Sequence, residues 1–120
     1  MTKTIAIDFD GVLHSYKSGW IAGHILEEPL NGALHFCHWL IENKFKIIIF
    51  SCRASDPVGF VAICTWLNEH NFPATIEVTH KKPDALLYID DRGMRFNGNF
   101  DEIMTFITNN PKLKTWQNHK

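Results

Sequence analysis

The residues of this sequence best able to do chemistry stand directly after short apolar runs. Two aspartates follow the run 4–7, a serine follows the run 46–50, and two more aspartates follow the run 85–89. These residues are Asp8, Asp10, Ser51, Asp90 and Asp91. Four carboxylates gathered in one place repel one another unless a cation lies between them. An all-oxygen ligand set suits Mg²⁺, and a hydroxyl and a lysine beside such an ion would hold a phosphoryl group.

Two lysines, Lys81 and Lys82, precede the run that ends at Ile89, so either could supply that positive charge. We favour Lys82 because it stands beside Pro83. The other lysine is then expected to be a solvated surface charge.

These side chains can meet only if the apolar runs are neighbouring strands of one sheet. The period of the apolar residues predicts strands and helices in alternation. Strands are expected at 4–7, 46–50, 75–79, 85–89 and 94–96, and helices from Pro29 to about 41, from Asp56 to about 70, and at 100–108. Such alternation indicates an α/β fold with a mainly parallel sheet. Right-handed crossovers put the carboxyl ends of the strands at one edge, where open α/β sheets bind ligands.

The same residues carry a resemblance to a known family. Asp8-Phe9-Asp10-Gly11-Val12-Leu13 resembles the first motif of the haloacid dehalogenase superfamily, D-x-D-G-[TV]-[LV]. Ser51 at the end of an apolar strand is similar to the second motif, and Lys82 followed by Pro83 is similar to the third. Tyr88-Ile89-Asp90-Asp91-Arg92 resembles the fourth, an apolar strand that ends in an acidic pair. All four occur in the family's order and span almost the whole chain.

The resemblance implies a Rossmann-like three-layer fold and a role for each motif. Asp8 would be the phosphate nucleophile and Asp10 the general acid and base. Ser51 would donate a hydrogen bond to the phosphoryl oxygen, and Lys82 would neutralise the charge on phosphate and nucleophile. The acidic pair would hold Mg²⁺ together with the two aspartates of the first motif. The candidate metal ligands are therefore Asp8, Asp10, Asp90 and Asp91.

One departure from the family's pattern concerns the cap domain that many members insert. The stretch between Leu13 and Ile47 has room for a helix and a flap hairpin, which would include Tyr16, Gly19 and Trp20, but not for a cap. We therefore expect a capless member whose site is open unless a partner subunit or a large substrate covers it. Capless relatives act on macromolecules, such as polynucleotide 3′-ends and phosphoproteins, or on small phosphates as oligomers.

Several assignments have a plainer alternative. Asp91 is a direct metal ligand, a neighbour that orients Asp90, or an ion-pair acceptor for Arg92. Cys52 and Arg53 are placed as substrate contacts next to Ser51, although Arg53 and Arg92 could equally form surface ion pairs. A cysteine phosphatase is excluded, because the arginine that its loop needs six residues after Cys52 is replaced by Val58.

Composition limits the classes of protein to consider. The chain has 120 residues, 45% of them apolar, and a formal net charge of −1, so one domain spanning 1–120 with a real core is expected. A net charge this close to zero gives no support for binding nucleic acid through overall electrostatic attraction, although a nucleic acid substrate is still considered. Three cysteines without a C-x-x-C pair fit a reducing compartment. No signal peptide or membrane span is apparent, so a cytoplasmic location without a membrane partner is expected.

These observations predict a Mg²⁺-dependent phosphomonoesterase that acts through an aspartyl-phosphate. Its substrate would be a nucleotide, a polynucleotide 3′-end or another exposed phosphate. The alternative from a different class is a non-catalytic phosphoacceptor or binding domain on the same fold. The two differ in the need for Asp10, because a persistent phosphoacceptor has no use for an acid and base beside its nucleophile.

Overall fold

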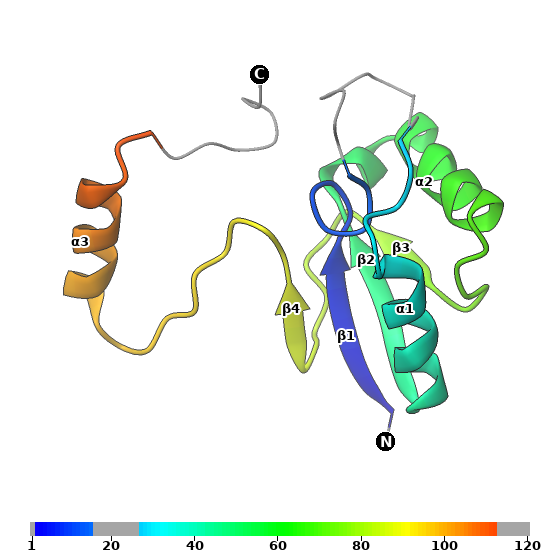
Figure 1. Ribbon diagram of the computed structural model, residues 1–120, viewed down its shortest axis with the longest axis horizontal. Coiled ribbons are helices and arrows are strands. Elements are labelled where there is room, and N and C mark those ends of the chain that lie inside the picture. Colours follow the sequence, from blue (N-terminus) through cyan, green and yellow to red (C-terminus); the bar gives the residue numbers. More distant parts are fainter. Residues whose placement is uncertain (1, 16–26, 113–120) are drawn as a thin grey trace.

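A four-stranded, all-parallel sheet organises the computed structural model, which describes residues 2–15 and 27–112. The strands are β1 (Lys3–Asp8), β2 (Phe45–Phe50), β3 (Glu77–Thr79) and β4 (Leu87–Ile89). They lie in the order β3-β2-β1-β4 (Figure 1). The expected α/β class with a parallel sheet is therefore confirmed.

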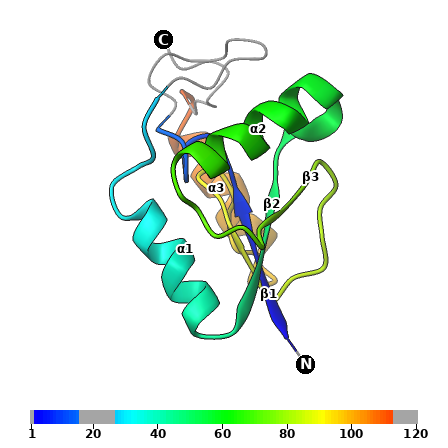
Figure 2. The same cartoon turned by 90° about the vertical axis from the view of Figure 1, so that its right-hand side faces the viewer.

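The core lies against one face of the two central strands. Register places Ile5 beside Ile47 and Ile7 beside Ile49, and all four side chains are buried. Helices α1 (Ala33–Glu42) and α2 (Pro57–Glu69) contribute to the same hydrophobic cluster. Figure 2 shows these two helices beside the sheet. Their buried core residues are Ala33, Cys37, Leu40, Ile63, Trp66 and Leu67.

Helix α2 begins where the sequence predicts. Asp56 is the N-cap residue, its Oδ1 accepts a hydrogen bond from the Gly59 N–H at 2.9 Å, and Pro57 occupies the first helical position. A short 3₁₀ helix, η1 (Cys52–Ser55), links β2 to this cap.

The first helix begins later than its apolar period indicates. Residues near Pro29 bind the loop after β1 instead, because the Leu30 N–H donates to the Leu13 carbonyl at 2.8 Å and Pro29 bridges His14. The helix then starts after Gly32, whose φ of 88° is the left-handed region. Two expected strands are likewise shorter than predicted: 75–79 is a strand at Glu77–Thr79 and 85–89 at Leu87–Ile89.

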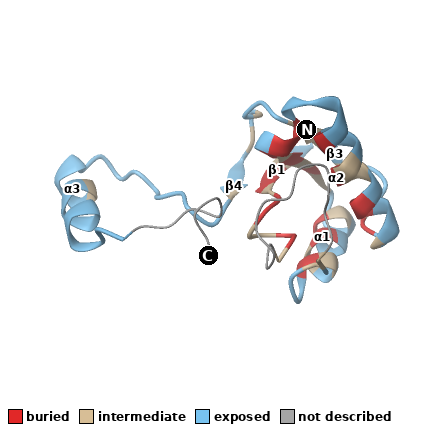
Figure 3. Cartoon of the chain, turned by 90° about the horizontal axis from the view of Figure 1, so that it is seen from above, coloured by how far each residue is buried: buried red, intermediate tan, exposed pale blue. Residues whose placement is uncertain are grey.

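The C-terminal part of the described chain departs most from expectation. The strand predicted at 94–96 is wrong, since those residues pair with no strand. A tight turn at Asp90, whose Oδ1 accepts from the Arg92 and Gly93 N–H groups, directs the chain away from β4 before such a strand could form. Helix α3 (Phe100–Asn109) follows at the predicted position, but none of its residues is buried. Figure 3 shows this helix apart from the sheet and exposed over most of its length.

Within the described ranges, no helix is long and apolar enough to cross a membrane. The flap hairpin expected to include Tyr16, Gly19 and Trp20 lies outside the described residues.

Candidate functional site

Three of the predicted acidic residues come together at the carboxyl ends of β1 and β4. Asp8 ends β1, while Asp90 and Asp91 follow β4. The two strands are parallel neighbours, with Ile7 beside Ile89, so their ends meet. One carboxylate oxygen from each aspartate lies within 4.8 Å of the other two. The structure therefore gathers two segments about 80 residues apart into one acidic group, which we call the aspartate triad.

Charge is poorly balanced at the aspartate triad. Burial, with smaller contributions from repulsion by Asp91, Asp90 and Asp10, raises the pKa of Asp8 from 3.8 to about 6. A hydrogen bond from the Phe9 N–H to Asp8 Oδ1, 2.8 Å long, opposes that rise in pKa. A partly buried carboxylate whose pKa rises for these reasons gains stability when a cation binds beside it. The three carboxylates are donors of the type that Mg²⁺ prefers.

Asp90 is held in place by its own turn. Its Oδ1 accepts from the Arg92 N–H at 2.6 Å and from the Gly93 N–H at 2.7 Å. These bonds fix the direction of the carboxylate and leave its other oxygen for a ligand. Asp90 is thus oriented by the backbone, as suits a metal-binding side chain.

Gly11 allows Asp91 to approach the loop after β1. It has a φ of 84°, and a Cβ at this position would overlap the Asp91 carboxylate. A side chain here would therefore be both strained and in collision. The glycine of the first motif and the second aspartate of the fourth motif thus contact one another directly.

Backbone hydrogen bonds shape the loop after β1. The Phe9 carbonyl accepts from the Leu13 and His14 N–H groups, both at 3.0 Å, and the Gly11 N–H donates to the His14 carbonyl at 2.9 Å. This closed turn brings His14 back beside Asp10, four residues earlier in the chain.

Asp10 points away from the aspartate triad into a buried ion pair. Arg53 donates from Nε to Asp10 Oδ2 at 2.8 Å and from Nη2 to Oδ1 at 3.0 Å. His14 Nδ1 lies 2.9 Å from the same Oδ1. Asp10 is 2% exposed and Arg53 is 3% exposed. Arg53, for which either a substrate contact or a surface ion pair is expected, forms a buried ion pair with the predicted acid and base, and its contact with substrate stays a prediction. The Asp10 carboxylate is not part of the triad.

His14 links Asp10 to a second layer of side chains. Its Nε2 lies 3.4 Å from Glu27 Oε1, and its ring stacks on Phe9 with the centroids 5.3 Å apart. Trp66 packs edge-on against both rings and donates from Nε1 to the Glu27 carbonyl at 2.9 Å. Sequence reasoning missed His14 and Glu27. Only the spacing of His14 from Asp10 in a tight loop could have indicated the first, and nothing indicated the second.

Ser51 lies at the same sheet edge as Asp8. Its preceding residue, Phe50, pairs with Asp8 in the register of β1 and β2. Ser51 is buried, its N–H donates to the Thr79 carbonyl at 3.0 Å, and its Oγ accepts from the Arg53 N–H at 3.2 Å. Cys52 is exposed at the start of η1.

The two candidate lysines lie on the connection between β3 and β4. Lys82 is exposed, and its Nζ lies 4.6 Å from the centroid of the Tyr88 ring, a cation–π contact. Lys81 is also exposed, and its backbone N–H donates to Thr79 Oγ1 at 3.1 Å. Neither ammonium has a described contact with the aspartate triad, so the choice between them stays a prediction.

Comparison with known proteins supports the fold. No family model matches the sequence, and no curated protein is significantly similar to it. A solved structure of a conserved protein from Bacteroides thetaiotaomicron is similar, with a TM-score of 0.59 and 24% sequence identity. The match covers 98% of this chain and 97% of that one. At this identity the likeness shows a shared α/β fold.

Proposed function

We propose that this protein is a Mg²⁺-dependent phosphomonoesterase of the haloacid dehalogenase type, with Asp8 as its nucleophile. The observation that carries the proposal is the aspartate triad, in which Asp8 lies within 4.8 Å of Asp90 and Asp91. Three acidic groups this close are costly in a structural role, because each destabilises the charged form of the others. A bound cation accounts for that cost, and it would in turn attract a phosphate.

The residues present fit Mg²⁺. Asp8, Asp90 and Asp91 would hold it through carboxylate oxygens, with Asp90 already oriented by two backbone N–H groups. When bound, the ion would keep Asp8 ionised and neutralise charge on the phosphoryl oxygens. Asp10 would not contribute its carboxylate, because Arg53 and His14 occupy it.

The chemistry we propose begins with attack of the Asp8 carboxylate on phosphorus, with release of the substrate alkoxide. Ser51, at the adjacent strand end, would donate a hydrogen bond to a phosphoryl oxygen, and Lys82 would neutralise phosphate charge. Asp10, which must be protonated when the cycle begins, would give its proton to the alkoxide and regain one from the water that hydrolyses the aspartyl-phosphate. For this, Asp10 must exchange a contact with Arg53 for one with the reacting group.

A specific observation favours the alternative function. In the structure, the Asp10 carboxylate is buried and accepts two hydrogen bonds from Arg53. An acid and base held in this way would act slowly, and a phosphoryl group on Asp8 would then persist. A phosphoacceptor or binding domain is therefore the second candidate, and the lifetime of the phosphorylated state separates the two.

The substrate class is inferred from charge and accessibility. The aspartate triad includes two exposed residues, which suits an exposed phosphate such as that of a nucleotide or a polynucleotide 3′-end. The net charge of −1 does not favour a long nucleic acid. We place the protein in the cytoplasm, because all three cysteines are free and Cys52 is exposed, as a reducing compartment allows.

Turnover of an aryl phosphate tests the proposal. Wild-type protein should hydrolyse it with Mg²⁺, EDTA should stop the reaction, and Ca²⁺ should replace Mg²⁺ poorly because it prefers more ligands at longer distances. Asp8→Asn should lower the rate by roughly a thousandfold or more. The control is Asp84→Asn, which changes an exposed carboxylate outside the triad. Activity that survives exhaustive chelation or the loss of Asp8 would refute the proposal.

A parallel screen of nucleotides, sugar phosphates, phosphopeptides and 3′-phosphorylated oligonucleotides would identify the substrate class.

A further inference from the structure

Residues 94–109, which we call the C-terminal arm, present an apolar surface that nothing in the described chain covers. Phe100, Met104 and Ile107 are spaced to form one stripe along α3, and their side chains are 69%, 57% and 55% exposed. Met94 and Phe96, just before the helix, are exposed as well. An apolar stripe of this kind normally packs against another element.

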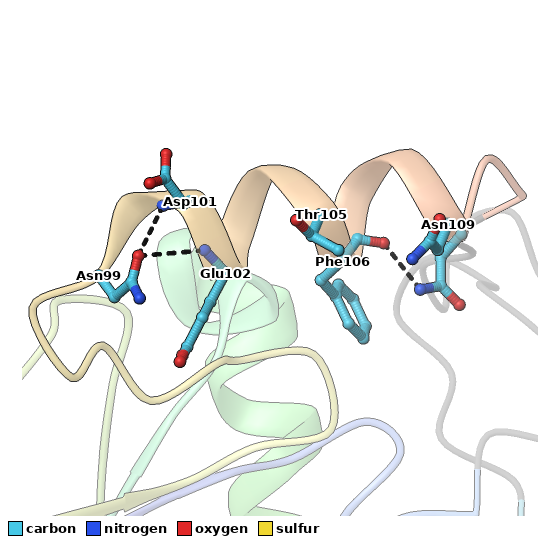
Figure 4. Close-up of a pocket in the computed structure, with 7 residues that line it drawn as sticks. Asn99, Asp101, Glu102, Thr105, Phe106 and Asn109 are labelled. Carbon is cyan, nitrogen blue, oxygen red and sulfur yellow. Dashed lines mark hydrogen bonds between the residues drawn. The ribbon is translucent and has the colours of Figure 1, made fainter.

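The helix is held by its own caps and not by packing. Asn99 Oδ1 accepts from the Asp101 and Glu102 N–H groups at 2.9 and 3.3 Å, as Figure 4 shows. Glu102 and Phe106 project to one side of the helix and Asp101 to the other (Figure 4), and an open depression runs along this part of the surface. A ten-residue helix is marginal in water without tertiary contacts. A surface to dock on is therefore required for a stable arm.

A complementary surface lies at the outer side of β4. This strand pairs only with β1 among the described residues, so the backbone groups along its other side have no strand partner. Leu86, Leu87 and Tyr88, in this strand or directly before it, are exposed, with the Tyr88 ring in contact with Lys82 and Phe50, and we call these three residues the β4 edge. Open apolar edges of this kind pair with further chain.

The arm does not lie on its own β4 edge. Figure 1 shows the chain after β4 running away from the sheet before α3 begins. The radius of gyration is 15.4 Å, against about 13–14 Å for a compact chain of this length. Within residues 2–15 and 27–112, one molecule thus carries an uncovered arm and a sheet edge without a further strand, separated by the turn at Asp90 and the extended residues that follow.

We propose that the chain forms a twofold dimer in which each copy's C-terminal arm docks on the β4 edge of the other copy. Such an exchange is closed and symmetric, and it covers both surfaces of both molecules. Nine exposed apolar side chains per copy take part, each able to bury on the order of 100 Å². They are Leu86, Leu87, Tyr88, Met94, Phe96, Phe100, Met104, Phe106 and Ile107. The sum over two copies reaches the 1,200–2,000 Å² or so that is typical of stable interfaces.

The first test measures molecular mass by sedimentation over a range of concentrations of the full chain. Wild-type protein should be a dimer at micromolar concentration. Met104→Asp, in the middle of the apolar stripe, should raise the dissociation constant at least a hundredfold. Thr105→Asp adds the same charge to the polar side of the same helix and should leave the dimer intact. Circular dichroism checks that each variant stays folded, which is expected because α3 lies outside the core.

The second test asks what the arm binds. Leu86→Asp, on the β4 edge but outside the strand, should also give monomers. An affinity-tagged Met104→Asp chain should then retain an untagged Leu86→Asp chain, because each variant keeps the surface that the other has lost. Wild-type monomers at all concentrations would overturn the proposal. So would a dimer that survives Met104→Asp, a dimer that survives Leu86→Asp because two arms pair with each other, or no retention in the mixture.

Discussion

Arg53 donates two hydrogen bonds to the carboxylate of Asp10, from Nε at 2.8 Å and from Nη2 at 3.0 Å, and both residues are almost fully buried. The pair joins the loop after β1 to the 3₁₀ helix after β2. It also orients Asp10 away from Asp8, so the position of the proposed acid and base depends on a residue 43 positions away.

Replacing Arg53 by Ala should destabilise the fold by about 3–5 kcal/mol, because the buried Asp10 carboxylate loses its guanidinium partner and keeps only the contact with His14. Urea unfolding measures the change. The control is Lys46→Ala, which removes an exposed ion pair with Glu77 that has a 2.7 Å contact. That change should cost less than about 1 kcal/mol. An equal loss of unfolding free energy in the two variants would contradict the stabilising role of the buried pair of Arg53 and Asp10.

Gly11→Ala should weaken Mg²⁺ binding, because the new Cβ would push the Asp91 carboxylate out of position. The matched control is Gly32→Ala, since Gly32 has a similar φ of 88° but no heavy atom within 4 Å of an added Cβ. Both variants should lose about 1 kcal/mol of stability to backbone strain. Only Gly11→Ala should raise the dissociation constant for Mg²⁺, measured by calorimetry, and we expect at least a tenfold rise. An equal affinity in both variants would show that Asp91 is not a ligand.

Asp8→Asn should stabilise the metal-free protein at about pH 7.5. The pKa of Asp8 is about 6 in the fold, above its usual 3.8, so the native state binds more protons than the unfolded state between these values. The free energy of unfolding of the wild type should therefore fall as the pH rises from about 4 to 6, and it should stay at the lower level above that range. Partial exposure of Asp8 limits this cost to the order of 1–2 kcal/mol.

Thermal unfolding across that pH range measures the difference between Asp8→Asn and wild type. The difference should vanish near pH 4, where wild-type Asp8 is protonated, and Mg²⁺ should stabilise only the wild type at neutral pH. Asp84→Asn serves as the control, because it removes an exposed carboxylate outside the aspartate triad. A variant that is less stable than wild type at every pH would contradict the account of Asp8 as a partly buried carboxylate with a raised pKa.

Local patterns predicted much of the fold. The Asp56-Pro57 start of α2 and the apolar strand ending at Phe50 follow from capping and burial, which are local properties. The strand predicted at 94–96 failed because a strand also needs a partner. The turn at Asp90 carries these residues away from β4, and no local pattern encodes that direction.

The candidate site was likewise predictable only in part. The meeting of Asp8 with Asp90 and Asp91 follows from the rule that parallel strands end at one edge. The partner of Arg53 could not be inferred, because a buried arginine and an exposed one have the same sequence context. Which carboxylate it neutralises depends on the path of the loop after β1.

The central claim is that a phosphoryl group passes through Asp8 and that Asp10 clears it. Intact-mass measurement after rapid quenching tests this, with an activated phosphate ester as donor and Mg²⁺ present. In Asp10→Asn, whose amide oxygen can still accept from Arg53, attack by Asp8 should continue while hydrolysis slows. The account predicts that this variant accumulates one phosphoryl group per chain, that wild type accumulates little, and that Asp8→Asn accumulates none. A long-lived adduct on wild type that is unchanged by Asp10→Asn, or an adduct that survives Asp8→Asn, would contradict it.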